Sequence, residues 1–242
     1  MKIKVDSTIN PKAVETPVPG NGIYAFVAEK AKITAQEIHD KILVTPLDKG
    51  KMFFVVGPVK SGKSVVAIEL NEIVEEKGIK NRNLAFAQPS VDRPDVPKNK
   101  IFSRVGKELK ATSFASKSDI EKIFHENEVV VIDEVQFTPA DLQSYLLSEI
   151  TLFLDRGGIF VGLGLDYTSQ GGEFIFAALL KSRAEKVYKL QSLCQMCGRM
   201  ADKYCQRLID GVPAGLDTPA LLSPSINVTY EPRCDECFVV KK

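Results

Sequence analysis

Residues 52 to 64 read Met52-Phe-Phe-Val-Val-Gly-Pro-Val-Lys-Ser-Gly-Lys-Ser64, a short apolar run followed directly by the pattern G-x-x-x-x-G-K-S. A strand, a glycine-containing loop and a helix start in this order form a cradle for nucleotide phosphates, because backbone N–H groups can converge on phosphate oxygens. We expect Lys63 to reach the β- and γ-phosphates and the Ser64 hydroxyl to bind Mg²⁺. The predicted phosphate-binding residues are Gly57, Pro58, Val59, Lys60, Ser61, Gly62, Lys63 and Ser64. The sequence therefore predicts binding of ATP or a related nucleotide.

Apolar runs and helix-like segments alternate after this motif. We expect strands at 52–56, 83–88, 129–132, 159–165 and 186–191, and helices at 63–77, 118–126, 139–155 and 172–182. This alternation is typical of an α/β fold with a mostly parallel sheet flanked by helices. Before it, prolines predict an irregular segment at 1–21, followed by a short strand at 22–28 and a helix opened by Thr34-Ala-Gln-Glu37.

Two carboxylates, Asp133 and Glu134, follow the apolar run 129–132. The carboxyl ends of parallel strands are where open α/β sheets bind their ligands, so both acids should lie beside the phosphate loop. Asp133 suits the binding of Mg²⁺, which leaves Glu134 free to act on a nucleophile. The alternative is a strand end capped by two solvated acids.

The five cysteines all lie between positions 194 and 237. Cys194, Cys197, Cys234 and Cys237 form two C-x-x-C pairs, which suit tetrahedral coordination of a structural Zn²⁺. The 36 residues between the pairs exceed the common spacing, and two disulfides are the alternative, disfavoured in a reducing compartment. Cys205 is expected to be a small buried residue or a free thiol.

Composition limits the possible size, partners and location of the protein. With 242 residues and a net charge of +1, the chain should form one sizeable domain plus a small appendage. No basic patch suggests direct nucleic-acid binding, and no apolar stretch suggests a leader or a membrane span. We therefore expect a cytoplasmic protein without membrane contacts.

From Lys51 to Lys242 the chain resembles the zinc-containing, RecA-like thymidine kinases. The resemblance rests on the following segments, in this order: Gly57-Pro-Val-Lys-Ser-Gly-Lys-Ser64, Val91-Asp-Arg93, Ser103-Arg-Val-Gly106, Ile132-Asp-Glu-Val-Gln-Phe137, Gly164-Leu-Asp166, Lys189-Leu-Gln-Ser-Leu-Cys-Gln-Met-Cys-Gly198, Gln206-Arg-Leu-Ile-Asp-Gly211 and Tyr230-Glu-Pro-Arg-Cys-Asp-Glu-Cys237. It implies transfer of the ATP γ-phosphoryl group to the 5′-hydroxyl of a pyrimidine deoxynucleoside. It also implies a homotetramer and inhibition by the end-product triphosphate.

The resemblance further implies roles for particular residues. Glu134 would be the general base, Asp133 would position Mg²⁺, and Arg93 would bring a positive charge to the phosphates. The implied nucleoside-binding residues are Gln136, Phe137, Phe174 and Tyr230. A lid at 221–229 would close over the base, held at both ends by zinc. The implied division is an N-terminal extension of unknown role (1–50), a P-loop kinase domain (51–191) and a zinc-binding lid domain (192–242).

Two departures from the family pattern fall on the nucleoside side. Ser169 stands where the family has a phenylalanine, and an expected threonine falls at Tyr204 or Cys205. Loss of a large apolar ring would make room for a pyrimidine with a bulkier or polar 5-substituent.

Two other functions remain open from the residues alone. A RecA-like ATPase would use the same phosphate loop and would let Glu134 activate water. A nucleotide sensor would have lost turnover altogether. The cysteine pairs with Tyr230 between them favour the nucleoside kinase, because they have no specific purpose in a motor.

Overall fold

The computed structural model describes residues 20–91, 99–103, 106–217 and 228–240. Its centre is a sheet of six parallel strands in the order β5-β2-β6-β7-β1-β8. The strands are β1 (Lys51–Val56), β2 (Leu84–Pro89), β5 (Thr112–Phe114), β6 (Val129–Ile132), β7 (Ile159–Gly164) and β8 (Lys186–Lys189). The parallel sheet confirms the predicted α/β class.

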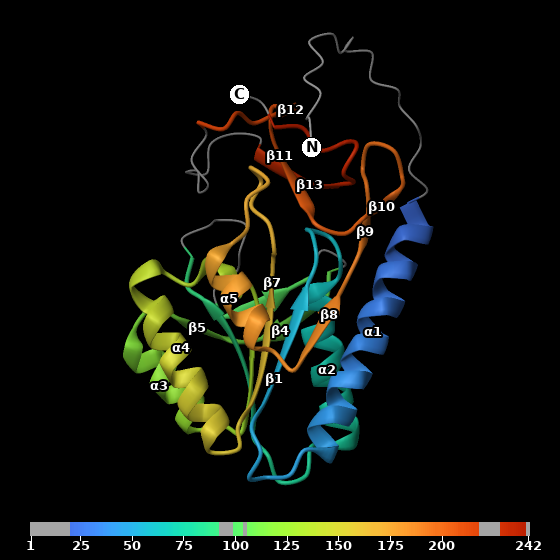
Figure 1. The fold of residues 1–242 in the computed structure, drawn as a ribbon. Coiled ribbons are helices and arrows are strands. Elements are labelled where there is room, and N and C mark those ends of the chain that lie inside the picture. Colours follow the sequence, from blue (N-terminus) through green and yellow to red (C-terminus); the bar gives the residue numbers. More distant parts are fainter. Residues whose placement is uncertain (1–19, 92–98, 104–105, 218–227, 241–242) are drawn as a thin grey trace.

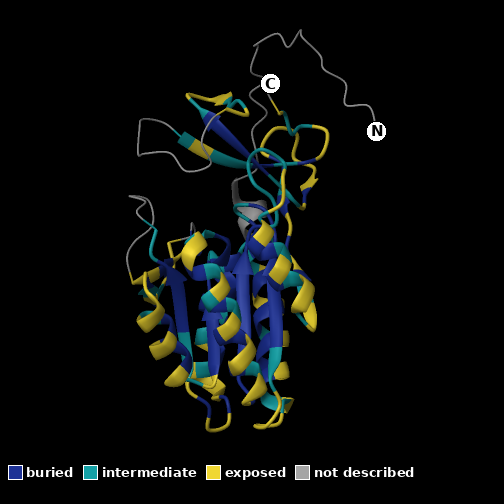
Figure 2. Cartoon of the chain, turned by 60° about the vertical axis from the view of Figure 1, so that its left-hand side comes forward, coloured by how far each residue is buried: buried dark blue, intermediate teal, exposed yellow. Residues whose placement is uncertain are grey.

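Helices cover both faces of this sheet (Figure 1). On one face lie α1 (Gly20–Val44) and α2 (Lys63–Lys77), and on the other lie α3 (Lys117–His125), α4 (Ala140–Asp155) and α5 (Ile175–Arg183). Side chains of the strands alternate between the two cores, as the pleat requires: Phe53 packs on the α1 and α2 side, and Phe54 on the α3 to α5 side. The four inner strands are accordingly buried along most of their length (Figure 2), whereas β5 and β8 at the two edges are each buried at one residue.

The register brings three strand ends together. Val56 at the end of β1 pairs with Gly164 at the end of β7, and Ile132 at the end of β6 pairs with Gly162 of β7. The segments that follow β1, β6 and β7 therefore emerge side by side at one edge of the sheet, where an open α/β sheet binds its ligand.

Helix α1 differs from the sequence-based expectation. The predicted strand at 22–28 and the predicted helix start at Thr34 are both wrong, because one helix runs from Gly20 to Val44 and buries Thr34 in its middle. No glycine or proline interrupts residues 23–45, and a stripe at helical spacing is almost fully buried against α2 and β1. This stripe comprises Ala31, Ala35, Ile38 and Ile42. The segment predicted as irregular at 1–21 lies almost wholly outside the described residues.

The other predicted elements agree with the structure to within a few residues. The helix expected at 172–182 starts later, at Ile175, and the strand expected at 186–191 ends at Lys189. The sequence did not predict a short antiparallel hairpin of β3 (Lys100–Phe102) and β4 (Glu108–Lys110). It also did not predict the 3-10 turn η1 (Val135–Phe137).

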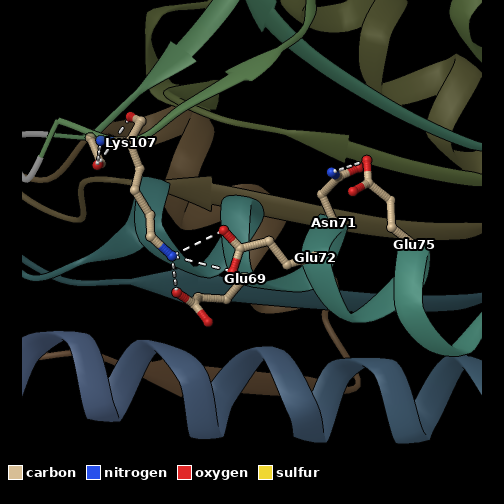
Figure 3. A network of polar contacts seen from close by, with 6 residues as sticks. Glu69, Asn71, Glu72, Glu75 and Lys107 are labelled. Atoms are coloured by element: carbon tan, nitrogen blue, oxygen red, sulfur yellow. Dashed lines mark hydrogen bonds and ion pairs between the residues drawn. The ribbon is translucent and has the colours of Figure 1, made fainter.

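This hairpin is tied to α2 by one lysine, Lys107 (Figure 3). Lys107 Nζ lies 2.9 Å from Glu69 Oε1 and 3.0 Å from Glu72 Oε1. The hydrogen bond to Glu69, and then the one to Glu72, raise the pKa of Lys107, so the ammonium stays charged. Together with Ile101 of β3, which is buried in the core shared with α2, these pairs hold the hairpin beside the helix that begins at the phosphate loop.

The C-terminal part forms two small antiparallel sheets above the carboxyl edge of the main sheet (Figure 1). Its strands are β9 (Ser192–Leu193), β10 (Met200–Ala201), β11 (Tyr204–Ile209), β12 (Val212–Pro213) and β13 (Val228–Arg233). They pair as β10-β9 and β12-β11-β13. None of the helices in the described part of the chain combines the length and the apolar character needed to cross a bilayer.

Candidate active site

The phosphate loop joins β1 to α2, and its shape depends on two glycines. A Cβ atom on Gly57 would lie 2.6 Å from the Leu190 carbonyl oxygen and 2.7 Å from Ser61 Oγ, so no side chain fits there. Gly62 precedes α2 with a φ of 92°, in the left-handed region that glycine adopts at least cost. The loop therefore keeps the form that points backbone N–H groups toward an anion.

Lys63 lies inside this loop and is 6% exposed. Its Nζ donates hydrogen bonds to the carbonyl oxygens of Gly57, at 2.9 Å, and of Pro58, at 2.8 Å. Burial lowers the pKa of Lys63, while the negative charges of Glu134 and Asp133 raise it. The ammonium is thus held at the loop, facing the two carboxylates predicted to share its site.

Asp133 and Ser64 meet across the end of the sheet. The Ser64 hydroxyl donates a 2.7 Å hydrogen bond to Asp133 Oδ2, which joins the phosphate loop to the end of β6. Burial, and then the charge of Glu134, raises the pKa of Asp133 to about 7, against the opposing effects of Ser64 and Lys63. A hydroxyl and a carboxylate side by side are oxygen ligands of the kind that Mg²⁺ takes, so these residues fit the predicted metal.

Glu134 is held by Gln136. Glu134 adopts a left-handed backbone conformation, with φ at 53°, and its side chain is half-buried. Gln136 Nε2 donates to Glu134 Oε2, while Gln136 Oε1 accepts a 3.0 Å hydrogen bond from the Leu165 N–H. Gln136 therefore links the carboxylate to the chain just after β7. The sequence predicted that Gln136 binds nucleoside, whereas the contacts described here are with Glu134 and the backbone.

Asp166, for which no role was predicted, lies at the same edge of the sheet. Lys181 Nζ donates to Asp166 Oδ2 at 3.2 Å, and Oδ1 is buried without a hydrogen-bond partner among the described residues. Its charge also acts on Lys63. The signal that identified Asp133, an apolar strand followed by an acid, is present here too, because Asp166 comes two residues after β7.

The predicted nucleoside-binding aromatics fall into two groups. The rings of Phe137 and Phe174 meet edge to face, with centroids 5.8 Å apart. Tyr230 lies in β13, opposite Arg207 of β11, whose guanidinium is 6.0 Å from the centre of the Tyr230 ring. Arg93 and most of the predicted lid, residues 221–227, lie outside the described residues.

A second aromatic group, not predicted, connects the loop after β7 to the C-terminal segment. Tyr204 stacks on Phe238 with ring centroids 4.2 Å apart and planes 7° apart, and Tyr167 packs against Tyr204 at 5.7 Å. Tyr167 belongs to the loop that carries Ser169, two residues before the position where the resemblance implies a phenylalanine. The place of Tyr204 in this group could have been predicted only with the knowledge that β11 lies against the chain at 238.

The four paired cysteines converge on one point. The Sγ atoms of Cys194, Cys197, Cys234 and Cys237 all lie within 4.8 Å of one another, and none of these cysteines is in a disulfide. Thiolates bound to one tetrahedral Zn²⁺ are about 3.8 Å apart, so this spacing suits zinc. Cys205 is buried and is not part of the cluster. The cluster connects the chain after β9 with the chain after β13 and indicates a structural zinc site.

The site borders directly on this cluster. Lys60 Nζ of the phosphate loop donates a 2.9 Å hydrogen bond to Gln195 Oε1, between Cys194 and Cys197. The Ser192 hydroxyl donates to the Lys60 carbonyl oxygen at 3.3 Å. The phosphate loop and the first cysteine pair are therefore in contact.

Comparisons with known proteins agree with this arrangement. The chain is similar to the thymidine kinase of Pyrobaculum aerophilum, with 34% identity over 193 residues that cover 77% of this chain and 97% of that protein. Among solved structures, that of C. elegans PCH-2 matches with a TM-score of 0.31 and 16% identity, over 69% of this chain and 41% of that one, which is too weak to bear on the fold. The family model described as thymidine kinase matches residues 50–238. The chain therefore belongs to the thymidine kinase family.

Proposed function

We propose that this member of the family transfers the γ-phosphoryl group of ATP to the 5′-hydroxyl of thymidine or of a 5-substituted pyrimidine deoxynucleoside. Family membership supports an ATP-dependent nucleoside phosphotransferase. The observation that carries the assignment of residues is the hydrogen bond between Ser64 and Asp133, 2.7 Å long, with Glu134 next in the chain. It joins a phosphate loop to a pair of acids, as phosphoryl transfer requires.

The chemistry needs positioning and charge neutralisation more than covalent participation. In the proposed reaction the 5′-oxygen forms a bond to the γ-phosphorus while the bond from that phosphorus to ADP breaks. Glu134 accepts the hydroxyl proton, and Gln136 keeps its carboxylate oriented. Lys63 and Arg93 offset the phosphate charge. Mg²⁺, held by Ser64 and Asp133, would neutralise the charge that develops on the leaving ADP.

On the nucleoside side the proposal rests on the aromatic residues. Phe137 and Phe174 would line one wall of the base pocket, and Tyr230 would stack on the base. Ser169 leaves room at the position of the family's phenylalanine, and the nearby Tyr167 and Tyr204 supply other apolar surface. This combination favours acceptance of a larger group at position 5 of the pyrimidine.

The cysteine cluster would bind zinc in a structural role. Four thiolates complete a tetrahedral shell, so the metal would have no open position for a substrate. Zinc would connect the two ends of the C-terminal segment and so support the lid domain at 192–242, separate from the kinase domain at 51–191. A homotetramer is the expected assembly, taken from the resemblance to the family, and the cytoplasm is the location that the sequence predicts.

The test is a phosphate-transfer assay with Mg²⁺ and ATP against thymidine, thymidylate and several 5-substituted deoxynucleosides. We expect a 5′-monophosphate product, and the Glu134→Gln variant should lose roughly 100-fold to 10,000-fold in kcat because it lacks the general base. Glu126→Gln, an exposed carboxylate at the end of α3, is the matched control and should retain activity. Hydrolysis of ATP with no acceptor phosphorylated would overturn the proposal in favour of an ATPase.

A further inference from the structure

Helix α1 lies outside the part of the chain that the family model matches, which begins at residue 50. It nevertheless packs lengthwise against α2, the helix that starts at the phosphate loop (Figure 1). An element that the family pattern does not include is therefore part of the wall behind the nucleotide site.

The contact between α1 and the phosphate loop is at Gly62. A Cβ atom on Gly62 would lie 2.8 Å from Val27 Cγ1, 3.3 Å from the Val27 carbonyl oxygen and 3.4 Å from Ala31 Cβ. Val27 is 7% exposed and Ala31 is fully buried, so both side chains are packed at this point. One turn of α1 thus lies directly on the loop residue that has the left-handed conformation.

The rest of α1 fixes the position of this turn. Its buried stripe joins the core formed by α2 and the sheet. Polar contacts hold its second half to the end of α2 and the chain beyond: Lys77 Nζ donates to Gln36 Oε1 at 3.0 Å, and Lys80 Nζ donates to the Leu43 carbonyl oxygen at 2.8 Å. His39 Nε2 lies 3.0 Å from the Gly78 carbonyl oxygen. Because α1 is attached from Ala31 to Leu43, directly after Val27 in the helix, Val27 cannot easily move away from Gly62.

We propose that Val27 and Ala31 are positioning residues for ATP, which hold Gly62 and the phosphate loop in the conformation that binds phosphate. A left-handed residue is one of several conformations open to glycine, and a loop that samples others must lose that freedom when ATP binds. Packing of α1 on Gly62 excludes these other backbone conformations before ATP binds. This inference rests on the proposed function only in taking ATP as the ligand of the loop.

The experiment compares two chemically identical truncations. Val27→Ala removes the methyl groups that face Gly62, whereas Val74→Ala makes the same deletion in the last turn of α2, in the same core but away from the loop. We expect Val27→Ala to raise the calorimetric Kd for Mg·ATP, and the KM for ATP, roughly threefold to tenfold, a range typical of residues that act on a site without touching its ligand. The KM for thymidine should stay unchanged. Val74→Ala should leave both nucleotide constants unaltered.

Val27→Thr provides a rescue, because threonine keeps the branched shape of valine and its hydroxyl can donate to the helix carbonyl four residues earlier, so most of the ATP affinity should return. An unchanged Kd for ATP in Val27→Ala, or equal losses in Val27→Ala and Val74→Ala, would overturn the inference and assign α1 a purely structural role. Calorimetric binding of ATP does not require turnover. Failure to phosphorylate a nucleoside therefore counts against the proposed function, and an unaltered ATP affinity in an active Val27→Ala enzyme counts against the role of α1.

Discussion

The phosphate side and the nucleoside side of this site are built in different ways. On the phosphate side, Lys63 and Ser64 begin α2 after β1, and Asp133 follows β6, which β7 separates from β1 in the same sheet. Their contacts are short, and Lys63 and Asp133 are buried. The predicted nucleoside side combines residues from the turn after β6, the loop after β7 and the small C-terminal sheets. We therefore propose that a rigid scaffold holds the chemistry and that longer connections select the substrate.

The largest effect expected from this difference comes from loss of the metal. Cys234→Ala would remove a zinc ligand, and we expect the chain to lose bound zinc and on the order of several kcal/mol of stability. Because the cluster connects the ends of the C-terminal segment, the KM for thymidine should rise more than the Kd for ATP. Metal analysis measures the bound zinc, thermal unfolding measures the loss of stability, and kinetics and binding assays give the KM for thymidine and the Kd for ATP. Cys205→Ala, outside the cluster, is the control and should retain the metal.

The contact of Lys60 with Gln195 makes this test sharper. If the two sides were independent, ATP affinity would survive metal loss without change. An equal loss of ATP and thymidine binding would instead show that the first cysteine pair supports the phosphate loop, and the division into two sides would fail. Thiol titration and metal analysis of the wild-type protein provide a further check. If they showed two disulfides and no zinc, the metal assignment would be contradicted.

A smaller effect is expected at Gln136, which connects the end of β6 to the chain after β7. Gln136→Leu keeps a similar volume but leaves Glu134 without its hydrogen-bond donor. We expect kcat to fall roughly tenfold to a hundredfold, in line with loss of a hydrogen bond to a charged group. If Gln136 supports Glu134, the KM for thymidine should change little. If it binds the nucleoside as the sequence predicted, that KM should rise. Gln143→Leu, on α4, serves as the matched control.

The two sides also differ in how well the sequence predicts them. Buried parallel strands are continuous apolar runs, so 129–132 could be assigned with its observed bounds, and the rule for ligand sites at strand ends then brought Asp133 to the phosphate loop. The same rule could have identified Asp166. The role of Gln136 in holding Glu134 could not be predicted by this rule, because its contact with the Leu165 N–H depends on the register between β6 and β7.

Helix α1 and the aromatic group show where sequence reasoning fails. The apolar run at 22–28 and the cap-like residues at 34–37 are local patterns, and packing of Ala31 and Ile38 against α2 overrode them. The stacking of Tyr204 on Phe238 joins positions 34 residues apart through the folding of the C-terminal segment, and no periodicity reports such a contact.

The smallest effect, and the most direct test of the nucleoside side, is expected at Ser169. This residue is half-buried in the loop after β7, and its neighbour Gln170 donates a 2.7 Å hydrogen bond to the carbonyl oxygen of Leu216, five residues before the predicted lid in the sequence. Ser169→Phe would restore the family's aromatic ring and reduce the space near the base. We expect kcat/KM for a 5-substituted deoxyuridine with a group larger than methyl to fall roughly threefold to tenfold relative to thymidine, as volume-based discrimination allows. The Kd for ATP should not move, whereas Ser182→Phe, on an exposed face of α5, should alter neither quantity. Equal rates for both substrates before and after the change would mean that Tyr167 and Tyr204 already close this wall, and substrate choice would then have to come from the lid.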